Sequence, residues 1–128
     1  MDDKFGLKTA ADRGVTLGEI GQKILFENDL VRVWEIRLEP GETIDFHIHY
    51  HPYLLVSLGG GENEIVTIFG KKISTQEPLG SFVFINEMRE VHRLTNKSKV
   101  AYFSRLIEIK SVTWTAANEN ATTVRGSK

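Results

Sequence analysis

The sequence predicts an all-β protein that folds as a single sandwich or barrel. From Lys23 onward the chain consists of about nine short runs rich in β-branched and aromatic residues, which are favoured in strands. Turn-forming residues stand between these runs, and no convincing amphipathic helix separates them. With 128 residues, the chain is long enough to bury one real core and short for two domains. Regularly spaced short strands without helices are typical of a single antiparallel β-domain.

Three segments are predicted along the chain. Residues 1–21 mix charged residues, glycine and threonine with weak periodicity, and indicate an irregular N-terminal arm. Residues 22–110 form the β-domain, whose strand-like runs are KILFEN (23–28), LVRVWEIRLEP (30–40), ETIDFHIHYH (42–51), PYLLVSLGG (52–60), NEIVTIFG (63–70), KKISTQE (71–77), SFVFINE (81–87), EVHRLTN (90–96) and KVAYFSRLIEIK (99–110). The turn signals between them are Asn28-Asp29, Pro40-Gly41, Gly59 to Gly61, Gly70, Pro78 to Gly80 and Asn96. Residues 111–128 are rich in Thr, Asn and Ala and predict a polar C-terminal tail pinned by Trp114.

The composition excludes several classes of function. Sixteen basic and seventeen acidic residues leave a net charge of -1, without the basic stripe that binds a phosphate backbone, so we expect no nucleic-acid partner. The chain has no cysteine, so a metal must be held by nitrogen and oxygen ligands. The acidic start lacks an apolar signal segment and no later run is long enough to span a bilayer, which predicts a cytoplasmic protein with no membrane partner.

Three of the four histidines lie within five residues. Alternate side chains of a strand share a face, so His47, His49 and His51 should point the same way, and Ile44, Phe46, Ile48 and Tyr50 the other way. The alternation alone allows two interpretations: a polar stripe facing water, or a metal site. His92 lies in a second strand-like run, where an antiparallel barrel can bring it beside the first histidines. Imidazoles from two strands that converge on one point can bind a divalent first-row metal.

Two motifs resemble those of the cupin superfamily. The first reads glycine, five residues, histidine, one residue, histidine, three or four residues, glutamate, six residues, glycine; Gly41, His47, His49 and Gly60 or Gly61 fall at the matching places. Downstream, Gly80, His92 and Asn96 resemble the second motif, and the resemblance covers roughly residues 24 to 110. Tyr53 or Leu54 stands where the family has its glutamate, and the second motif lacks its Pro and Gly and is one residue longer.

The resemblance implies a double-stranded β-helix, or jelly roll, whose interior holds one divalent metal ion per subunit. His47, His49 and His92 would be the ligands, with Fe2+ favoured and Zn2+, Ni2+ or Mn2+ as alternatives. If these histidines face inward, the apolar residues between them face outward and need a cover. A second subunit or its N-terminal arm would supply that cover, which predicts a homodimer.

Other polar residues are weaker candidates for the site. His51 is predicted as a further ligand or a general base, and Tyr53 as a catalytic hydrogen-bonding group in place of the glutamate; a rim histidine before Pro52 and a packed aromatic are the alternatives. Arg105 alternates with Phe103 and Ile107, and either binds an anionic substrate or extends its stem along an apolar face. A solvated outer face is the simpler interpretation of the remaining charged residues in strand-like runs, Arg37, Glu62, Glu64 and Glu90.

Three neutral imidazoles leave the charge of a bound ion uncompensated, which favours small anionic, chelating substrates such as enolates, 2-oxo acids and 2-hydroxy acids. The resemblance implies a metal-dependent enzyme of the dioxygenase type. A metal-dependent isomerase or lyase and a non-catalytic small-molecule-binding protein are the alternatives. A regulatory β-domain has little support, because no helix-turn-helix pattern is attached.

Overall fold

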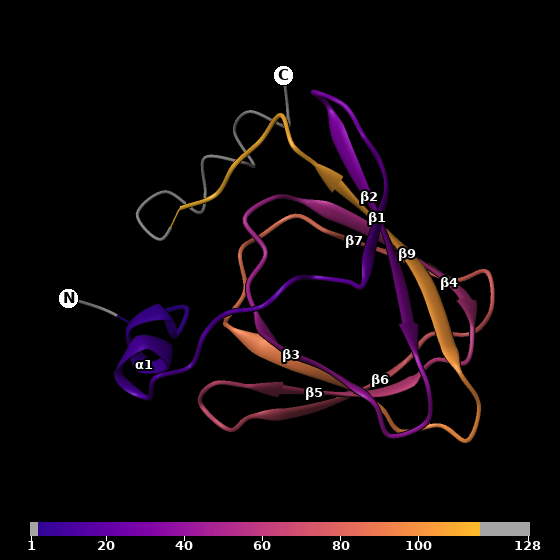
Figure 1. Ribbon diagram of the computed structural model, residues 1–128, viewed down its shortest axis with the longest axis horizontal. Helices are drawn as coiled ribbons and strands as arrows, with labels where there is room; N and C mark the ends of the chain where they lie inside the picture. The colour runs from indigo at the N-terminus through magenta and orange to yellow at the C-terminus, as the bar shows by residue number, and fades with distance from the viewer. Residues whose placement is uncertain (1–2, 116–128) are drawn as a thin grey trace.

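Two antiparallel sheets face each other and form a barrel in the computed structural model, which describes residues 3–115 (Figure 1). The five-stranded sheet contains, in spatial order, β1 (Lys23–Glu27), β2 (Val31–Leu38), β9 (Tyr102–Ile109), β4 (Tyr53–Gly59) and β7 (Phe82–Ile85). The four-stranded sheet contains β3 (Thr43–His47), β8 (His92–Asn96), β5 (Glu62–Thr67) and β6 (Lys72–Gln76). The predicted all-β fold is confirmed, and each of these strands lies within or overlaps one predicted run.

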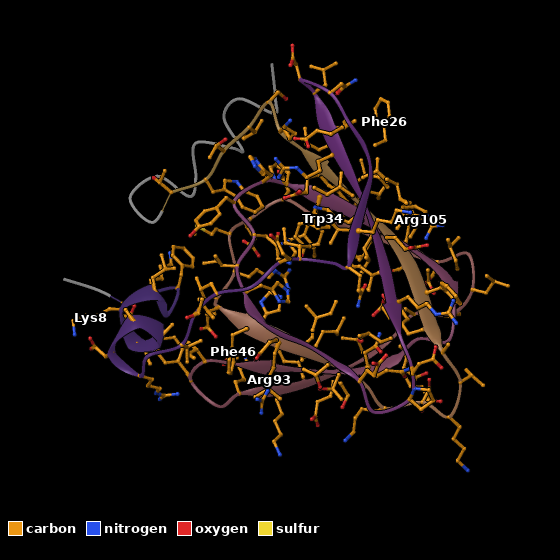
Figure 2. The ribbon with its side chains drawn as sticks, in the orientation of Figure 1. Lys8, Phe26, Trp34, Phe46, Arg93 and Arg105 are labelled. Atoms are coloured by element: carbon orange, nitrogen blue, oxygen red, sulfur yellow. The ribbon has the colours of Figure 1, made fainter. Side chains whose placement is uncertain are left out.

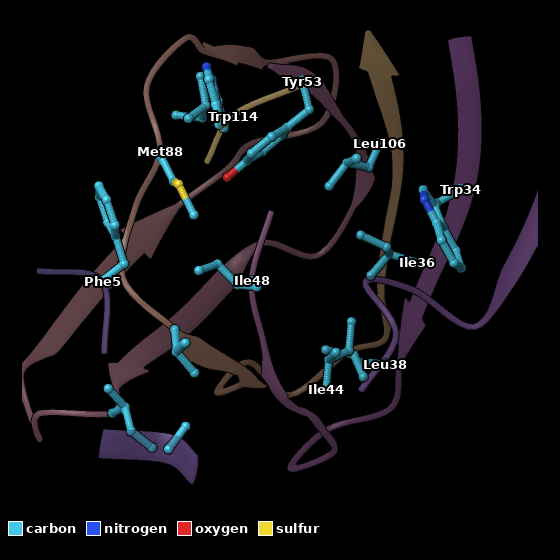
Figure 3. Close-up of a cluster of buried hydrophobic side chains, with 14 of the residues drawn as sticks. Phe5, Trp34, Ile36, Leu38, Ile44, Ile48, Tyr53, Met88, Leu106 and Trp114 are labelled. Atoms are coloured by element: carbon cyan, nitrogen blue, oxygen red, sulfur yellow. The ribbon is translucent and has the colours of Figure 1, made fainter. Parts of the chain in front are cut away.

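The core lies between the sheets and extends beneath the N-terminal segment. Buried apolar side chains come from both sheets and from the loops that close the barrel, as Figure 3 shows for Trp34, Ile36, Ile48, Tyr53 and Leu106. Period-two alternation explains this burial in β9, where every second residue from Tyr102 to Glu108 is buried. Trp114 is also buried, and its backbone N–H donates to the Tyr50 carbonyl, so the predicted pinning of the tail is confirmed. Residues 116–128 of the predicted tail lie outside the described residues.

The N-terminal segment differs from the irregular arm that the sequence predicts. It contains a six-residue helix, α1 (Leu7–Asp12), beside one end of the four-stranded sheet (Figure 1). Phe5 is buried and its carbonyl accepts a hydrogen bond from the Val91 N–H, while Arg13 donates to the Ile68 carbonyl at 2.7 Å. A helix of six residues is too short to be stable alone, so these contacts with the barrel stabilise it. In the described part of the chain no helix has the length and hydropathy needed to cross a bilayer.

The prediction that Ile44, Phe46, Ile48 and Tyr50 face outward is wrong for Ile44 and Ile48, which are buried, and a β-bulge explains the burial of Ile44. In the pairing of β3 with β8, Ile44 lies opposite Leu94 and His47 opposite His92, so β3 takes three steps where β8 takes two. The extra residue shifts the alternation, and Ile44 and His47 both face the interior. Ile48 is buried as well, and only Tyr50 of the predicted outward set is classed as exposed.

Residues 15–20 of the same chain lie beside β3 and pack against the core. The Gly18 N–H donates to the Phe46 carbonyl at 2.9 Å, and Val15, Leu17 and Ile20 pack against the core. Phe46 itself is half-buried and carries the Arg93 guanidinium over its ring at 5.1 Å (Figure 2). The predicted homodimer stays a prediction.

Candidate metal centre

Three histidines converge inside the barrel. His47 and His92 are direct cross-strand partners on β3 and β8, with ring centroids 4.6 Å apart. His49 follows two residues after the end of β3, and its ring centroid lies 5.2 Å from that of His47 and 5.4 Å from that of His92. One ring nitrogen of each residue lies within 4.8 Å of the others, and all three side chains are buried. The convergence predicted for these three residues is confirmed.

Backbone carbonyls fix the orientation of two of the rings. The Nδ1 atoms of His47 and His92 lie 2.7 Å from the carbonyl oxygens of Asp45 and Glu90, in each case two residues earlier in the chain. A carbonyl can only accept, so each Nδ1 carries the proton and each Nε2 keeps a free lone pair. Histidines that bind a metal through one ring nitrogen usually donate from the other to a carbonyl or carboxylate oxygen, as here. The Nδ1 of His49 is buried without a hydrogen-bond partner.

The three imidazoles are neutral at pH 7. Burial, assisted by the nearby His92, lowers the pKa of His47 from 6.5 to about 4. Burial also lowers the pKa of His92, and it lowers the pKa of His49 well below 6.5. Neutral imidazole is the form that binds a metal, so no deprotonation is needed at this pH.

Tyr53 packs directly against the histidine group. Its ring stacks on that of His49 with centroids 4.2 Å apart and an interplanar angle of 24°. Burial raises the pKa of Tyr53 to about 12, so the phenol keeps its proton, and its hydroxyl points into the interior of the barrel (Figure 3). The structure thus places Tyr53 beside the histidine group. Its catalytic role stays a prediction.

His51 and Arg105 do not line the interior as Tyr53 does. His51 is half-buried, and its Nδ1 lies 2.7 Å from the Val112 carbonyl, outside both cavities described below. Arg105 lies on the outer side of the five-stranded sheet (Figure 2), with a nitrogen 3.7 Å from a Glu35 carboxylate oxygen. Of the two interpretations of Arg105, the structure supports a stem along an apolar face. The catalytic role predicted for His51 stays a prediction.

Two cavities that share part of their lining adjoin the histidines. The inner cavity has a volume of about 70 Å³ and is lined by all three histidines, Tyr53 and Glu77. The outer cavity has a volume of about 680 Å³, includes His92 and Tyr53 in its wall, and lies between the edge strands β6 and β7. Its walls combine apolar side chains with three basic residues, Lys4, Lys71 and Arg89, and three acidic ones, Glu77, Glu87 and Glu90. This volume is in the range of small-molecule sites.

A second polar cluster in the cavity was missed by sequence reasoning. The Tyr102 hydroxyl donates to one Glu77 oxygen at 2.5 Å, and Asn63 and Thr75 donate to the other, each at 3.1 Å. Burial and the Glu77 charge raise the pKa of Tyr102, which keeps its proton on the phenol. The Asn63 side-chain oxygen is buried and has no hydrogen-bond partner. The only sequence signal was the alternation that places Tyr102 on the inward face of its strand.

Comparisons with known proteins agree with this architecture. The structure resembles a cupin domain from Bordetella pertussis Tohama I with 26% identity and a TM-score of 0.63, over 69% of this chain and 90% of that chain. A protein with a double-stranded β-helix domain from Klebsiella pneumoniae has 20% identity and a TM-score of 0.54, over 79% and 88% of the two chains. A cupin superfamily protein from Desulfitobacterium hafniense has 17% identity and a TM-score of 0.51, over 68% and 73%. No protein-family model matches the chain, and a search of curated proteins finds no match.

The fold and the site define a small β-barrel protein with a buried three-histidine group. Together with the solved structures, these features assign the chain to the cupin superfamily. The group could bind a metal: nitrogen atoms that share one ion at about 2.1 Å lie at most about 4.2 Å apart, and the three ligand atoms here lie within 4.8 Å of one another.

Proposed function

We propose that the protein is a metal-dependent enzyme with a three-histidine centre, which acts on a small anionic, oxygenated substrate by a dioxygenase-type reaction. The observation that carries this proposal is the group of three buried neutral imidazoles, which within residues 3–115 includes no carboxylate. Fe2+ is the favoured ion; His47, His49 and His92 would hold it, and it would supply the redox chemistry for a reaction of a chelating substrate with dioxygen. Both atoms of dioxygen enter the products, so the reaction needs no external reductant.

The residues of the cavity have distinct roles in this proposal. The apolar side chains of the outer cavity hold the body of the substrate, and its anionic group binds at Lys71, because Arg89 in the same wall already lies 3.9 Å from Glu87. Tyr53, protonated and stacked on His49, donates a hydrogen bond to a substrate oxygen. At the far end of the inner cavity, the Glu77 carboxylate accepts a hydrogen bond from a substrate hydroxyl.

Metal content is the first test of the proposal. Protein made without a purification tag should contain one divalent ion per chain, measured by mass spectrometry. His92→Ala should lose this ion, and His51→Ala should keep it, because His51 lies outside the group. Equal loss from both variants would contradict the assignment of the ligands. Protein that binds no divalent ion, and is not stabilised by one, would sink the proposal.

Oxygen consumption is the second test. The Fe2+ form should consume oxygen with a β-diketone, a 2-oxo acid or a 2-hydroxy acid, and Tyr53→Phe should slow the turnover while keeping the metal. A ligand that raises the melting temperature yet stays chemically unchanged would instead favour the non-catalytic binding protein. Conversion of the substrate without oxygen uptake would favour an isomerase or lyase.

A further inference from the structure

We propose that the substrate carries a second carboxylate, separate from its chelating group, which binds to the Lys71 ammonium and the Thr67 hydroxyl in the wall of the outer cavity. This inference rests on the proposed function, because it takes the histidine group as the site of the chelating end. The expected substrate class is a small 2-hydroxy or 2-oxo acid that ends in a second carboxylate, rather than any anionic chelator.

The strand register places Thr67 and Lys71 in one row with two of the histidines. His47 lies opposite His92 in the pairing of β3 with β8, and His92 lies opposite Thr67 in the pairing of β8 with β5. The β5–β6 register continues to Lys71, where the Thr67 N–H donates to the Lys71 carbonyl at 2.9 Å. Cross-strand partners share a face, so these four side chains form one polar row across the inner face of the four-stranded sheet.

The next inward row of the same sheet is apolar. Leu94 lies opposite Ile65, and Ile65 lies opposite Ile73. All three side chains line one of the two cavities, or both. A ligand that follows the polar row therefore has charged or hydrogen-bonding partners at its ends and an apolar surface along its middle. A hydrocarbon linker between two acidic ends fits this arrangement.

The Thr67 hydroxyl is a positioned hydrogen-bond donor. Its oxygen accepts from the backbone N–H groups of Phe69 and Lys71, at 3.3 Å and 3.2 Å. A hydroxyl has two lone pairs and one hydrogen, so both lone pairs are engaged and the hydrogen is left to donate. Within residues 3–115 this hydrogen has no acceptor. Thr67 is only 6% exposed and lines the outer cavity, where a ligand carboxylate can accept from it.

The charges of the outer cavity leave Lys71 as a cation for this carboxylate. In the described part of the chain, residues 3–115, Lys71 has no ion-pair partner. Of the three acidic residues in the wall, Glu77 already accepts hydrogen bonds from three side chains, and Glu87 lies 3.9 Å from Arg89. Glu90 is the third, and its charge opposes an anion in this cavity.

The spacing of the row sets the length of the substrate. Neighbouring strands lie about 4.8 Å apart, so the backbone at Thr67 is about 5 Å from His92 and that at Lys71 is about 10 Å away. The flexible lysine stem can bend back to bring its ammonium group toward Thr67. With carbon–carbon bonds of about 1.5 Å, a linker of about two or three carbon atoms crosses one strand spacing.

Two matched acids test the second carboxylate. The probes are 2-hydroxyglutarate and 2-hydroxypentanoate, which share the carbon chain and the chelating group and differ only in the terminal carboxylate. The protein is loaded with Zn2+, which has no redox chemistry, and binding is measured by isothermal titration calorimetry. The dissociation constant should be at least about tenfold lower for 2-hydroxyglutarate. Equal constants overturn this inference and leave the proposed function standing, whereas binding of neither acid overturns both.

Lysine variants locate the subsite. Lys71→Met should remove the preference for 2-hydroxyglutarate, because it keeps an apolar stem and loses the charge. Lys72→Met is the matched control: Lys72 is the next residue of β6, points to the opposite face and lines neither cavity, so the preference should remain. A preference that survives in Lys71→Met, or that falls equally in both variants, overturns the inference.

Two further positions test the partners of the carboxylate. Glu90→Gln should tighten the binding of 2-hydroxyglutarate and leave that of 2-hydroxypentanoate unchanged, because only the former brings a second negative charge. Thr67→Val should reduce the preference and Thr67→Ser should keep it, since serine retains the hydroxyl. Melting temperatures check that each variant is folded. Equal constants for the valine and serine variants exclude Thr67 from the subsite, and weaker binding in Glu90→Gln contradicts an anion at this place.

Discussion

Two glycines that flank Gly60 at the end of β4, Gly59 and Gly61, should respond oppositely to substitution by alanine. A Cβ on Gly61 would stand 2.2 Å from the Glu77 carbonyl oxygen, and the φ of Gly61 is 120°. A Cβ on Gly59 would meet no atom within 4 Å, and its φ is not in the positive region. The pair therefore differs in strain and in space, while the chemical change is identical.

The expected magnitudes follow from these two environments. In Gly61→Ala the unfavourable φ costs about 1–3 kcal/mol and the overlap with backbone costs about 1–3 kcal/mol, for a total of about 4 kcal/mol. In Gly59→Ala the loss of freedom in the unfolded chain stabilises the fold by about 0.4–1 kcal/mol. Gly61→Ala should also displace Glu77, because the Glu77 N–H donates to the Gly61 carbonyl at 2.8 Å.

Urea unfolding followed by tryptophan fluorescence measures both effects at one pH. Thermal unfolding gives a second measurement. In a chain of this length the melting temperature should fall by roughly 10–20 °C for the Gly61 variant and rise by a few degrees for the Gly59 variant. The reasoning is refuted if both variants change stability in the same direction by similar amounts, because the close approach to Glu77 would then be absent.

Two further predictions concern buried ionisable groups. His47 takes up a proton near pH 6.5 in the unfolded chain and only near pH 4 in the folded one. Its contribution to the free energy of unfolding is therefore complete above pH 6.5 and is lost as the pH falls through 4. The difference amounts to about 3 kcal/mol in the metal-free protein. Urea titrations with chelator should show this loss in the parent and a shallower one in His47→Gln, and equal slopes would contradict it. Glu108 is buried and accepts from Trp34 Nε1 at 2.6 Å and from Arg32 at 3.2 Å. Glu108→Leu should cost about 1–3 kcal/mol by leaving the Trp34 Nε1–H without an acceptor, whereas Arg32 keeps its pairing with Glu27, and Glu108→Gln should cost less because an acceptor for Trp34 remains; equal costs in urea would show that the lost charge alone decides.

The sequence predicts the features that local patterns determine. Strands and turns were placed correctly because alternation and turn residues act over a few positions. The histidine group was found because two motifs name its members. The face of Ile44 was missed, since a β-bulge depends on pairing with β8 and leaves no mark in β3 itself. The Glu77 cluster was missed because its partners Asn63 and Tyr102 come from different sheets and meet only in the folded barrel.

The inserted residue in β3 allows one strand both to pack an apolar side chain in the core and to direct a histidine into the cavity. In a regular strand only every second residue would face the cavity. If Ile44 faced the core in such a strand, His47 would face solvent. With it, Ile44 can fill the barrel while His47 reaches the metal group from the same strand. Removing one residue between them should therefore invert one half of the strand relative to the other.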